Sequence, residues 1–320
     1  MTADRKTLGE FLEETPFSDA SSAAKLRTLL LDLSGACRTI ARRVADEPWR
    51  SRGARDGWMG HLRSSARDGR GLNACNLHRG PYLAVLLPVD SPSNIAVNAP
   101  GGTIFSVMQA GNGKQGADCA QVCAGYAIHG PSLVLVLALA VGVNAFVLDA
   151  TSGEFLLIAA DMRIPAATDR IAIDATDTRF WQPAIRRYVD ECLAGEPGPR
   201  GRNFRFQWLG SMVAEAHCIL LRGGVFVRPA TGRVDDRVRQ PRLLHEAGPL
   251  SFLIERAGGR TSTGTGRLLD VAAGLSRQRT PLIFGAAEEV ERIEAYHLDH
   301  QAIGYDAPLF AERGLFRSTV

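Results

Sequence analysis

The sequence predicts a layered α/β protein, on three observations. Residues 82–87 form a short apolar run rich in Leu and Val, which is typical of a buried strand. Apolar residues recur with a helical period between residues 23 and 45. The apolar segment 133–148 is interrupted at Gly142 and Asn144, which favours two buried strands joined by a turn at 142–144 over a membrane span.

Length and composition bound the class of protein. A chain of 320 residues with 45% hydrophobic and 22% charged residues is long enough to bury a large core and to form two lobes. The formal net charge of +3 does not indicate a nucleic-acid partner. No apolar run follows a basic start, so we expect a cytoplasmic protein with no membrane partner. The six cysteines are scattered without metal-binding spacing and are expected to be free thiols.

A polar turn follows the predicted strand at 82–87. Pro88 lacks a backbone N–H and ends the strand's hydrogen-bond ladder, and Asp90, Ser91, Ser93 and Asn94 then crowd together. Short polar side chains at the end of a buried strand often hold an anion or a metal ion. The segment 103–108 is expected to be a second strand of the same sheet.

These residues carry a family resemblance. The sequence LPVDSPSNIA at 87–96, followed by GTIF at 102–105, resembles the signature DPLDGSSNID…GTIF of class 1 fructose-1,6-bisphosphatases. The frame is kept, but family residues are replaced at Leu87, Ser91, Pro92 and Ala96. Further similar motifs occur in the family's order across residues 7–298, at 7–12, 33–41, 121–130, 142–149, 152–155, 208–217 and 242–249.

The resemblance and the local patterns together predict the remaining elements. Thr7 is expected to cap a short helix, with Glu10 at the third position. The motif at 121–130 resembles a helix and turn of the family. We further expect strands at 171–174, 223–227 and 281–285 and helices at 183–193, 208–217 and 287–297.

The resemblance implies a specific fold and reaction. The fold is the sugar-phosphatase αβαβα sandwich, with an N-terminal lobe at 1–167, a C-terminal lobe at 168–320 and the site between them. The family reaction is the Mg²⁺-dependent hydrolysis of fructose 1,6-bisphosphate to fructose 6-phosphate and phosphate, in gluconeogenesis or the Calvin cycle. The expected assembly is a cytosolic homotetramer.

The family's metal site is incomplete in this sequence. Relatives supply five carboxylates and a backbone carbonyl, and the matching residues here are the carboxylates of Asp90 and Glu246 and the carbonyl of Val89. The other three positions are Leu87 and, in an ungapped register, Ala66 and Arg67; this region is polar and looks shortened, and Asp68 stands alone. We therefore predict that Mg²⁺ binds weakly or not at all. The alternatives are a turn-stabilising role for Asp90 and a helix N-terminal role for Glu246.

The family's sugar-phosphate contacts are also altered. Asp90 and the hydroxyls of Ser91 and Ser93 are candidates for the reactive phosphate, although Pro92 removes a backbone N–H. A sugar-binding Asn is replaced by Asp174, a Tyr by Arg228, and two cationic contacts by Gln207 and Gln240. The candidate substrate-binding residues are Asp90, Ser91, Ser93, Asp174, Arg228 and Gln240. Arg228 either holds a phosphate or is an exposed residue at a strand end.

Two functional hypotheses follow. The first is a fructose-1,6-bisphosphatase with impaired activity, and no residue is assigned a catalytic role. The second is a catalytically silent paralogue that binds a sugar phosphate or assembles with an active relative. Dinucleotide-binding, Walker and nucleophile-elbow motifs are absent from the sequence, so none of the enzyme classes that these motifs mark is indicated.

Overall fold

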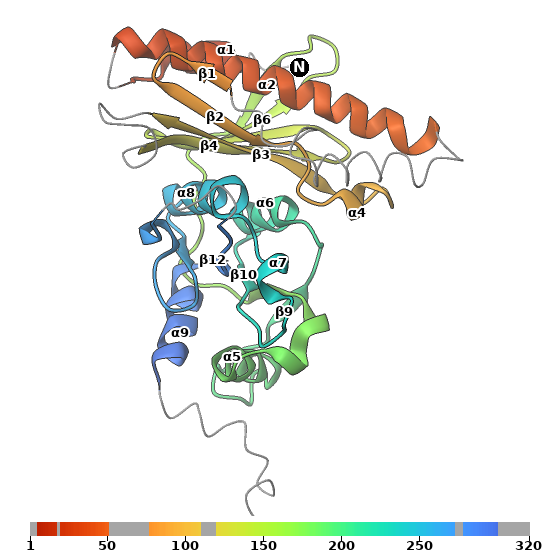
Figure 1. Cartoon of the computed structure of the whole chain (residues 1–320), viewed down its shortest axis with the longest axis vertical. Helices are drawn as coiled ribbons and strands as arrows, with labels where there is room; N and C mark the ends of the chain where they lie inside the picture. The colour runs from red at the N-terminus through yellow and green to blue at the C-terminus, as the bar shows by residue number, and fades with distance from the viewer. Residues whose placement is uncertain (1–4, 18–19, 51–76, 110–119, 273–277, 300–320) are drawn as a thin grey trace, which may run out of the picture.

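The computed structural model describes residues 5–17, 20–50, 77–109, 120–272 and 278–299, and it has five layers (Figure 1). Helices α1 (Leu8–Glu14) and α2 (Ala20–Arg50) cover one face of a seven-stranded sheet. Helices α6 (Met212–Arg222) and α8 (Gly248–Arg256) lie between this sheet and a five-stranded sheet. Helices α5 (Pro183–Leu193) and α9 (Ala287–Leu298) cover the far side. The predicted αβαβα sandwich is confirmed.

The first sheet is an antiparallel meander in which every strand pairs with its neighbour in sequence. Its strands are β1 (Leu77–Arg79), β2 (Tyr82–Leu87), β3 (Gly101–Gln109), β4 (Ala120–His129), β5 (Val134–Leu139), β6 (Gly142–Leu148) and β7 (Phe155–Ala159). The expected pairing of 82–87 with 103–108 is confirmed, because β2 and β3 run antiparallel from the Tyr82–Gln109 pair to the Leu87–Ile104 pair. The turn between them includes one helical turn, α4 (Pro92–Ile95).

Two local expectations are corrected. The motif at 121–130 is not a helix but strand β4, which pairs with β3 and β5 on its two sides. The strand is central and buried on both faces, so its apolar residues do not alternate with polar ones, and the small residues among them fit either structure. The turn between β5 and β6 lies at residues 140–141, just before the expected 142–144.

The N-terminal helices form as the sequence predicts. The backbone N–H of Glu10 donates to Thr7 Oγ1 and the Glu10 carboxylate accepts from the Thr7 backbone N–H, which completes a capping box. Helix α2 then buries Leu26, Leu29 and Leu33 against the sheet at the helical spacing.

The second sheet has the order β11-β12-β10-β8-β9. Its strands are β8 (Arg170–Ile173), β9 (Arg205–Gln207), β10 (Val225–Arg228), β11 (Arg260–Ser262) and β12 (Leu282–Gly285). Strand β10 pairs in parallel with β8 and antiparallel with β12. The short helical segments η1 (Ala175–Phe180), α7 (Asp236–Arg239), η2 (Leu243–Ala247) and η3 (Leu268–Asp270) complete this lobe.

Three apolar clusters join the five layers. One lies between the N-terminal helices and the first sheet, one between the two sheets around α6 and α8, and one beneath α5 and α9. In the part of the chain that the structure describes, the helices are too short or too polar to cross a membrane. The four described cysteines, at positions 37, 123, 192 and 218, are free thiols as expected.

Candidate active site

Asp90 lies at the C-terminal end of β2, where the two lobes meet. Its Oδ1 accepts a hydrogen bond from the Gly102 backbone N–H at 2.7 Å. Its Oδ2 accepts from the Ser211 hydroxyl at 2.7 Å and from the Val213 backbone N–H at 3.1 Å, both at the start of α6. Asp90 therefore joins the second and third strands of one lobe to a helix of the other.

The close approach of α6 to the first sheet requires a glycine at position 102. A Cβ atom there would lie 2.3 Å from Val213 Cγ1 and 2.8 Å from the Ala127 carbonyl oxygen. The absence of a side chain lets the Gly102 N–H and the Val213 N–H reach the same carboxylate.

Burial dominates the electrostatics of Asp90. Removal from water raises the pKa of its carboxyl group, and the nearby Glu246 carboxylate adds to the rise. The hydrogen bonds from Ser211, Val213 and Gly102 act in the opposite direction, because they favour the ionised form.

The serines of the turn point in different directions. Ser91 is buried and its hydroxyl donates to the Gly210 carbonyl oxygen at 2.9 Å, which adds a third bond between the lobes to the two that Asp90 makes. Asn94 Nδ2 donates to the Leu209 carbonyl oxygen at 2.6 Å, which adds a fourth. Ser93 is exposed on α4. Only the Ser93 hydroxyl therefore stays available to a ligand.

Glu246 lies in η2, and its carboxylate is turned back toward Arg242 at the start of the same segment. Its Oε2 accepts from the Arg242 backbone N–H at 2.7 Å and from Arg242 Nε at 3.2 Å. Its charge raises the pKa of Asp90 and also favours the charged form of Arg228, so it acts on both the lobe junction and the second lobe's pocket. The expectation of a helix N-terminal acid fits its place in the first turn of η2.

The described residues do not fit a magnesium cluster. Both oxygens of Asp90 are occupied by protein donors, and Glu246 Oε2 is held by Arg242. Leu87 is only 8% exposed and belongs to the apolar cluster between the sheets. Among residues 5–17, 20–50, 77–109, 120–272 and 278–299, no three His, Cys, Asp or Glu side chains gather closely enough to hold a metal ion. The predicted positions at Ala66, Arg67 and Asp68 lie outside these ranges.

Three predicted substrate residues lie together in one pocket of the second lobe. Asp174 follows β8, Arg228 ends β10, and Gln240 follows α7. The lining also contains Asp177, Trp181, Val227, Pro229, Thr231, Asp236 and Arg239. The structure thus separates the predicted residues into a junction group around Asp90 and this pocket.

Arg228 and Gln240 each have unused hydrogen-bonding capacity in the pocket. Burial lowers the pKa of Arg228, partly offset by the carboxylates of Glu246 and Asp174, and Arg228 forms no ion pair with any described residue. Gln240 is 5% exposed; its Nε2 donates to the Pro229 carbonyl oxygen and to Asp236 Oδ1, both at 2.9 Å. Its Oε1 has no hydrogen-bond partner among the residues that the structure describes. The pocket therefore offers a cation and an acceptor to a ligand.

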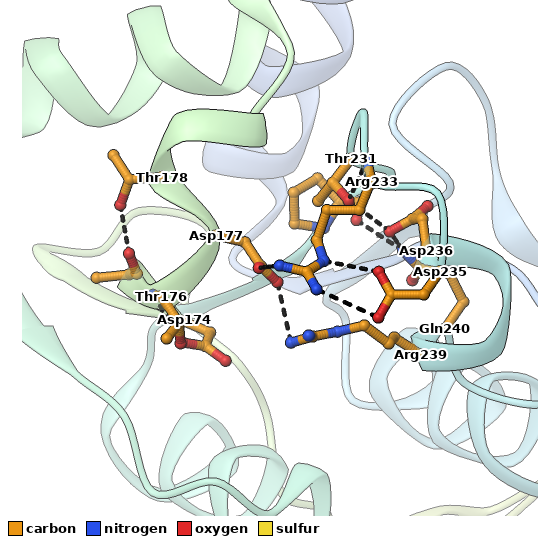
Figure 2. Close-up of polar contacts among 12 residues, drawn as sticks. Asp174, Thr176, Asp177, Thr178, Thr231, Arg233, Asp235, Asp236, Arg239 and Gln240 are labelled. Atoms are coloured by element: carbon orange, nitrogen blue, oxygen red, sulfur yellow. Dashed lines mark hydrogen bonds and ion pairs between the residues drawn. The ribbon is translucent and has the colours of Figure 1, made fainter.

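Sequence reasoning missed the ion pairs between Asp177 and Arg239, which line this pocket, and between Asp177 and the neighbouring Arg233. The Asp177 carboxylate pairs with Arg233 at 3.3 Å and with Arg239 at 3.1 Å, as Figure 2 shows. The alternating charges of the segment 233–239 were the available signal, but such a segment is usually a solvated loop. Its pairing with Asp177, 56 residues away from Arg233, is visible only in the fold.

Comparison with known proteins agrees with the fold. Two family models match, described as the N-terminal domain (residues 71–160) and the C-terminal domain (residues 164–298) of fructose-1-6-bisphosphatase. The structure is similar to the crystal structure of Leishmania major fructose-1,6-bisphosphatase in apo form, with a TM-score of 0.75 and 25% identity, covering 92% of this chain and 99% of that one. The T-state structure of the same protein gives a TM-score of 0.76 at 24% identity, with the same coverage.

Curated relatives match along nearly the whole chain. The chain is 40% identical to "Fructose-1,6-bisphosphatase class 1 3" of Methylibium petroleiphilum over 351 aligned positions, covering 98% of both proteins. It is 39% identical to "Fructose-1,6-bisphosphatase class 1" of Hydrogenophilus thermoluteolus, again covering 98% of both. An alignment of 351 positions exceeds the 320 residues of this chain, so the Methylibium relative contains insertions relative to it. The chain belongs to the class 1 fructose-1,6-bisphosphatase family.

Proposed function

We propose that this protein binds a fructose phosphate and hydrolyses fructose 1,6-bisphosphate far more slowly than an ordinary enzyme of its family. One observation carries the proposal. Asp90, which matches a family metal ligand, gives both of its carboxylate oxygens to Gly102, Ser211 and Val213. The residue that would bind a cation instead joins the lobes.

The substrate class rests on the family and on the pocket. The relatives that match the whole chain are named fructose-1,6-bisphosphatases. The guanidinium of Arg228 suits a phosphate, since it presents several N–H donors in one plane. The Oε1 of Gln240, which has no partner among the described side chains and backbone groups, suits a donor such as a sugar hydroxyl.

The slow turnover follows from the donor set. In this family the divalent cation supplies charge neutralisation for phosphoryl transfer and activates the attacking water. Each loss of about 1.4 kcal/mol of transition-state stabilisation lowers the rate tenfold. A metal site lacking most of its carboxylates should therefore lower turnover by several orders of magnitude, while Arg228 still holds a ligand.

A catalytically silent paralogue is the second candidate, and Leu87 favours it. Leu87 occupies the position of a family carboxylate and is packed in the apolar cluster between the sheets. Because this side chain now serves the core in place of metal binding, it favours a protein that keeps the fold and the pocket but does not hydrolyse the phosphate ester.

Phosphate release from fructose 1,6-bisphosphate, with Mg²⁺ and with Mn²⁺, tests the proposal against the Methylibium relative assayed in parallel. We expect a release rate at least about 1000-fold below that relative, together with calorimetric binding of fructose 6-phosphate that is lost in Arg228→Gln. A rate within tenfold of the relative would refute impaired activity. No release above background, with binding retained, would establish the silent alternative.

Assembly, location and lobe boundary remain predictions from the resemblance. We propose a homotetramer in the cytoplasm that acts in gluconeogenesis or the Calvin cycle, with lobes at 1–167 and 168–320. Light scattering on the purified protein tests the assembly, since a monomeric mass would contradict it.

A further inference from the structure

The Asp177 carboxylate has an unusual set of partners. Its two oxygens pair with Arg233 Nη1 at 3.3 Å and Arg239 Nη2 at 3.1 Å, and its side chain is 14% exposed. Both partners reach it from the segment that contains α7, across the pocket from η1 (Figure 2). Among the described contacts, Asp177 accepts only from guanidinium groups.

The other carboxylates near the pocket have local roles. Asp174 accepts from the backbone N–H of Thr176 and caps η1. Asp236 accepts from Thr231 Oγ1 and from Gln240 Nε2. Asp235 pairs with Arg233 but is half exposed and does not line the pocket. Asp177 is therefore the pocket carboxylate whose partners are all cations.

The pocket lining contains two guanidinium groups, those of Arg228 and Arg239, and the three carboxylates described above. Arg228 and Arg239 both line the pocket, and the charge of Arg239 disfavours the charged form of Arg228. Both guanidinium groups are therefore close enough to the same pocket to affect each other. Arg239 is paired with Asp177, whereas Arg228 forms no ion pair within the described ranges. Gln240 belongs to the same lining, and its buried Oε1 accepts no hydrogen bond from any residue in the described part of the chain.

We propose that Asp177 is an internal counter-anion, and that the phosphate group of a sugar phosphate displaces it to bind between Arg228 and Arg239. The inference rests on the proposed function, because it assigns the sugar phosphate to this pocket. A phosphate monoester carries up to two negative charges and three acceptor oxygens, so it can replace one carboxylate and also satisfy Arg228. Asp177 thereby sets the affinity of the pocket, since a ligand must first break two ion pairs.

The direct test is calorimetric titration of the full chain with fructose 6-phosphate. Asp177→Asn keeps the shape of the side chain and removes its charge, so we expect the dissociation constant to fall at least fivefold. Asp235→Asn is the matched control: it removes a carboxylate paired with the same Arg233 outside the pocket, and we expect a change below twofold. A dissociation constant that is unchanged or larger in Asp177→Asn would overturn the inference.

A second variant measures the competition itself. In the wild-type protein, Arg239→Gln removes a ligand contact but also one of the bonds that hold Asp177 in place, so we expect less than a threefold loss of affinity. In the Asp177→Asn background the same change removes only a ligand contact, and we expect at least a tenfold loss. Equal losses in the two backgrounds would show that Asp177 and the ligand do not compete for Arg239.

The outcomes separate this inference from the proposed function. Binding that is unaffected by Asp177→Asn would overturn the counter-anion role and leave the sugar-phosphate pocket intact. Absence of millimolar binding in the wild-type protein and in Asp177→Asn, with folding verified by circular dichroism, would overturn both. Asp177→Ser provides the same readout if the Asn variant does not fold. Inorganic phosphate, titrated in parallel, reports how much of the gain comes from the bare anion.

Discussion

The role assigned to Asp90 predicts a specific loss of stability in Asp90→Ala. The substitution leaves the N–H groups of Gly102 and Val213 without their acceptor in a buried junction. Each unsatisfied buried donor costs about 1–3 kcal/mol, while the Ser211 hydroxyl can rotate toward another acceptor. Removing a desolvated carboxylate, whose pKa is raised by burial and by Glu246, returns part of this cost. We expect a net loss of about 3 kcal/mol in the free energy of unfolding.

Urea denaturation in the presence of EDTA measures this loss, with Asp90→Asn as the matched control. Asn keeps one acceptor oxygen in place and avoids the buried charge, so we expect it to cost about 1 kcal/mol, less than Ala. If Asp90 were instead a metal ligand without its cation, its removal would have the opposite effect on the free energy of unfolding. The carboxylate would be repelled by Glu246 in the absence of metal, so its removal would leave the stability unchanged or raise it. That result would refute the junction role of Asp90.

Three further predictions follow from the same structure. Leu87→Asp buries a carboxylate in the apolar cluster, so we expect the free energy of unfolding, measured with urea, to fall by about 3 kcal/mol without any gain in phosphate release. A gain in release should need Ala66→Glu and Arg67→Glu as well. A tenfold gain from Leu87→Asp alone would contradict this. Titration calorimetry with Mg²⁺ should give a dissociation constant of about 1 mM or weaker, and tight binding that Asp90→Ala abolishes would disprove it. Burial lowers the pKa of His129 to about 4, below its unfolded value of about 6.5, so the stability it contributes is complete above about pH 6.5 and is lost as the pH falls toward 4. In urea denaturation, the free energy of unfolding should fall by up to about 3 kcal/mol as the pH is lowered across that window. This pH dependence should be absent in His129→Gln.

The strands and helices with clear local signals could be predicted from the sequence. The apolar run before Pro88, the capping box of Thr7 and Glu10 and the helix at 183–193 all form as expected. Strand β4 was missed because a central strand buried on both faces has no alternation to separate it from a buried helix.

The candidate site could be predicted only in part. Asp174, Arg228 and Gln240 were identified by position and do line one pocket. Two of the three partners of Asp90 belong to the other lobe, and nothing local to residues 88–94 indicates that Ser211 and Val213 will reach it. The ion pairs of Asp177 were missed for the same reason, because they depend on how η1 faces α7. Chemistry that joins distant segments needs the tertiary structure.

The contrast between the two sheets has a consequence for synthesis on the ribosome. The strands of the first sheet pair only with sequence neighbours, so that sheet can assemble by successive hairpins as residues 77–159 emerge. In the second sheet, β10 lies between β8 and β12, so the sheet cannot be completed until residue 285 has left the exit tunnel. Until α6 and α8 arrive, the face of the first sheet that contributes Ile104, Tyr126 and Val136 to the middle cluster stays exposed to water. The nascent chain therefore passes through a stage at which an apolar sheet face needs protection from aggregation.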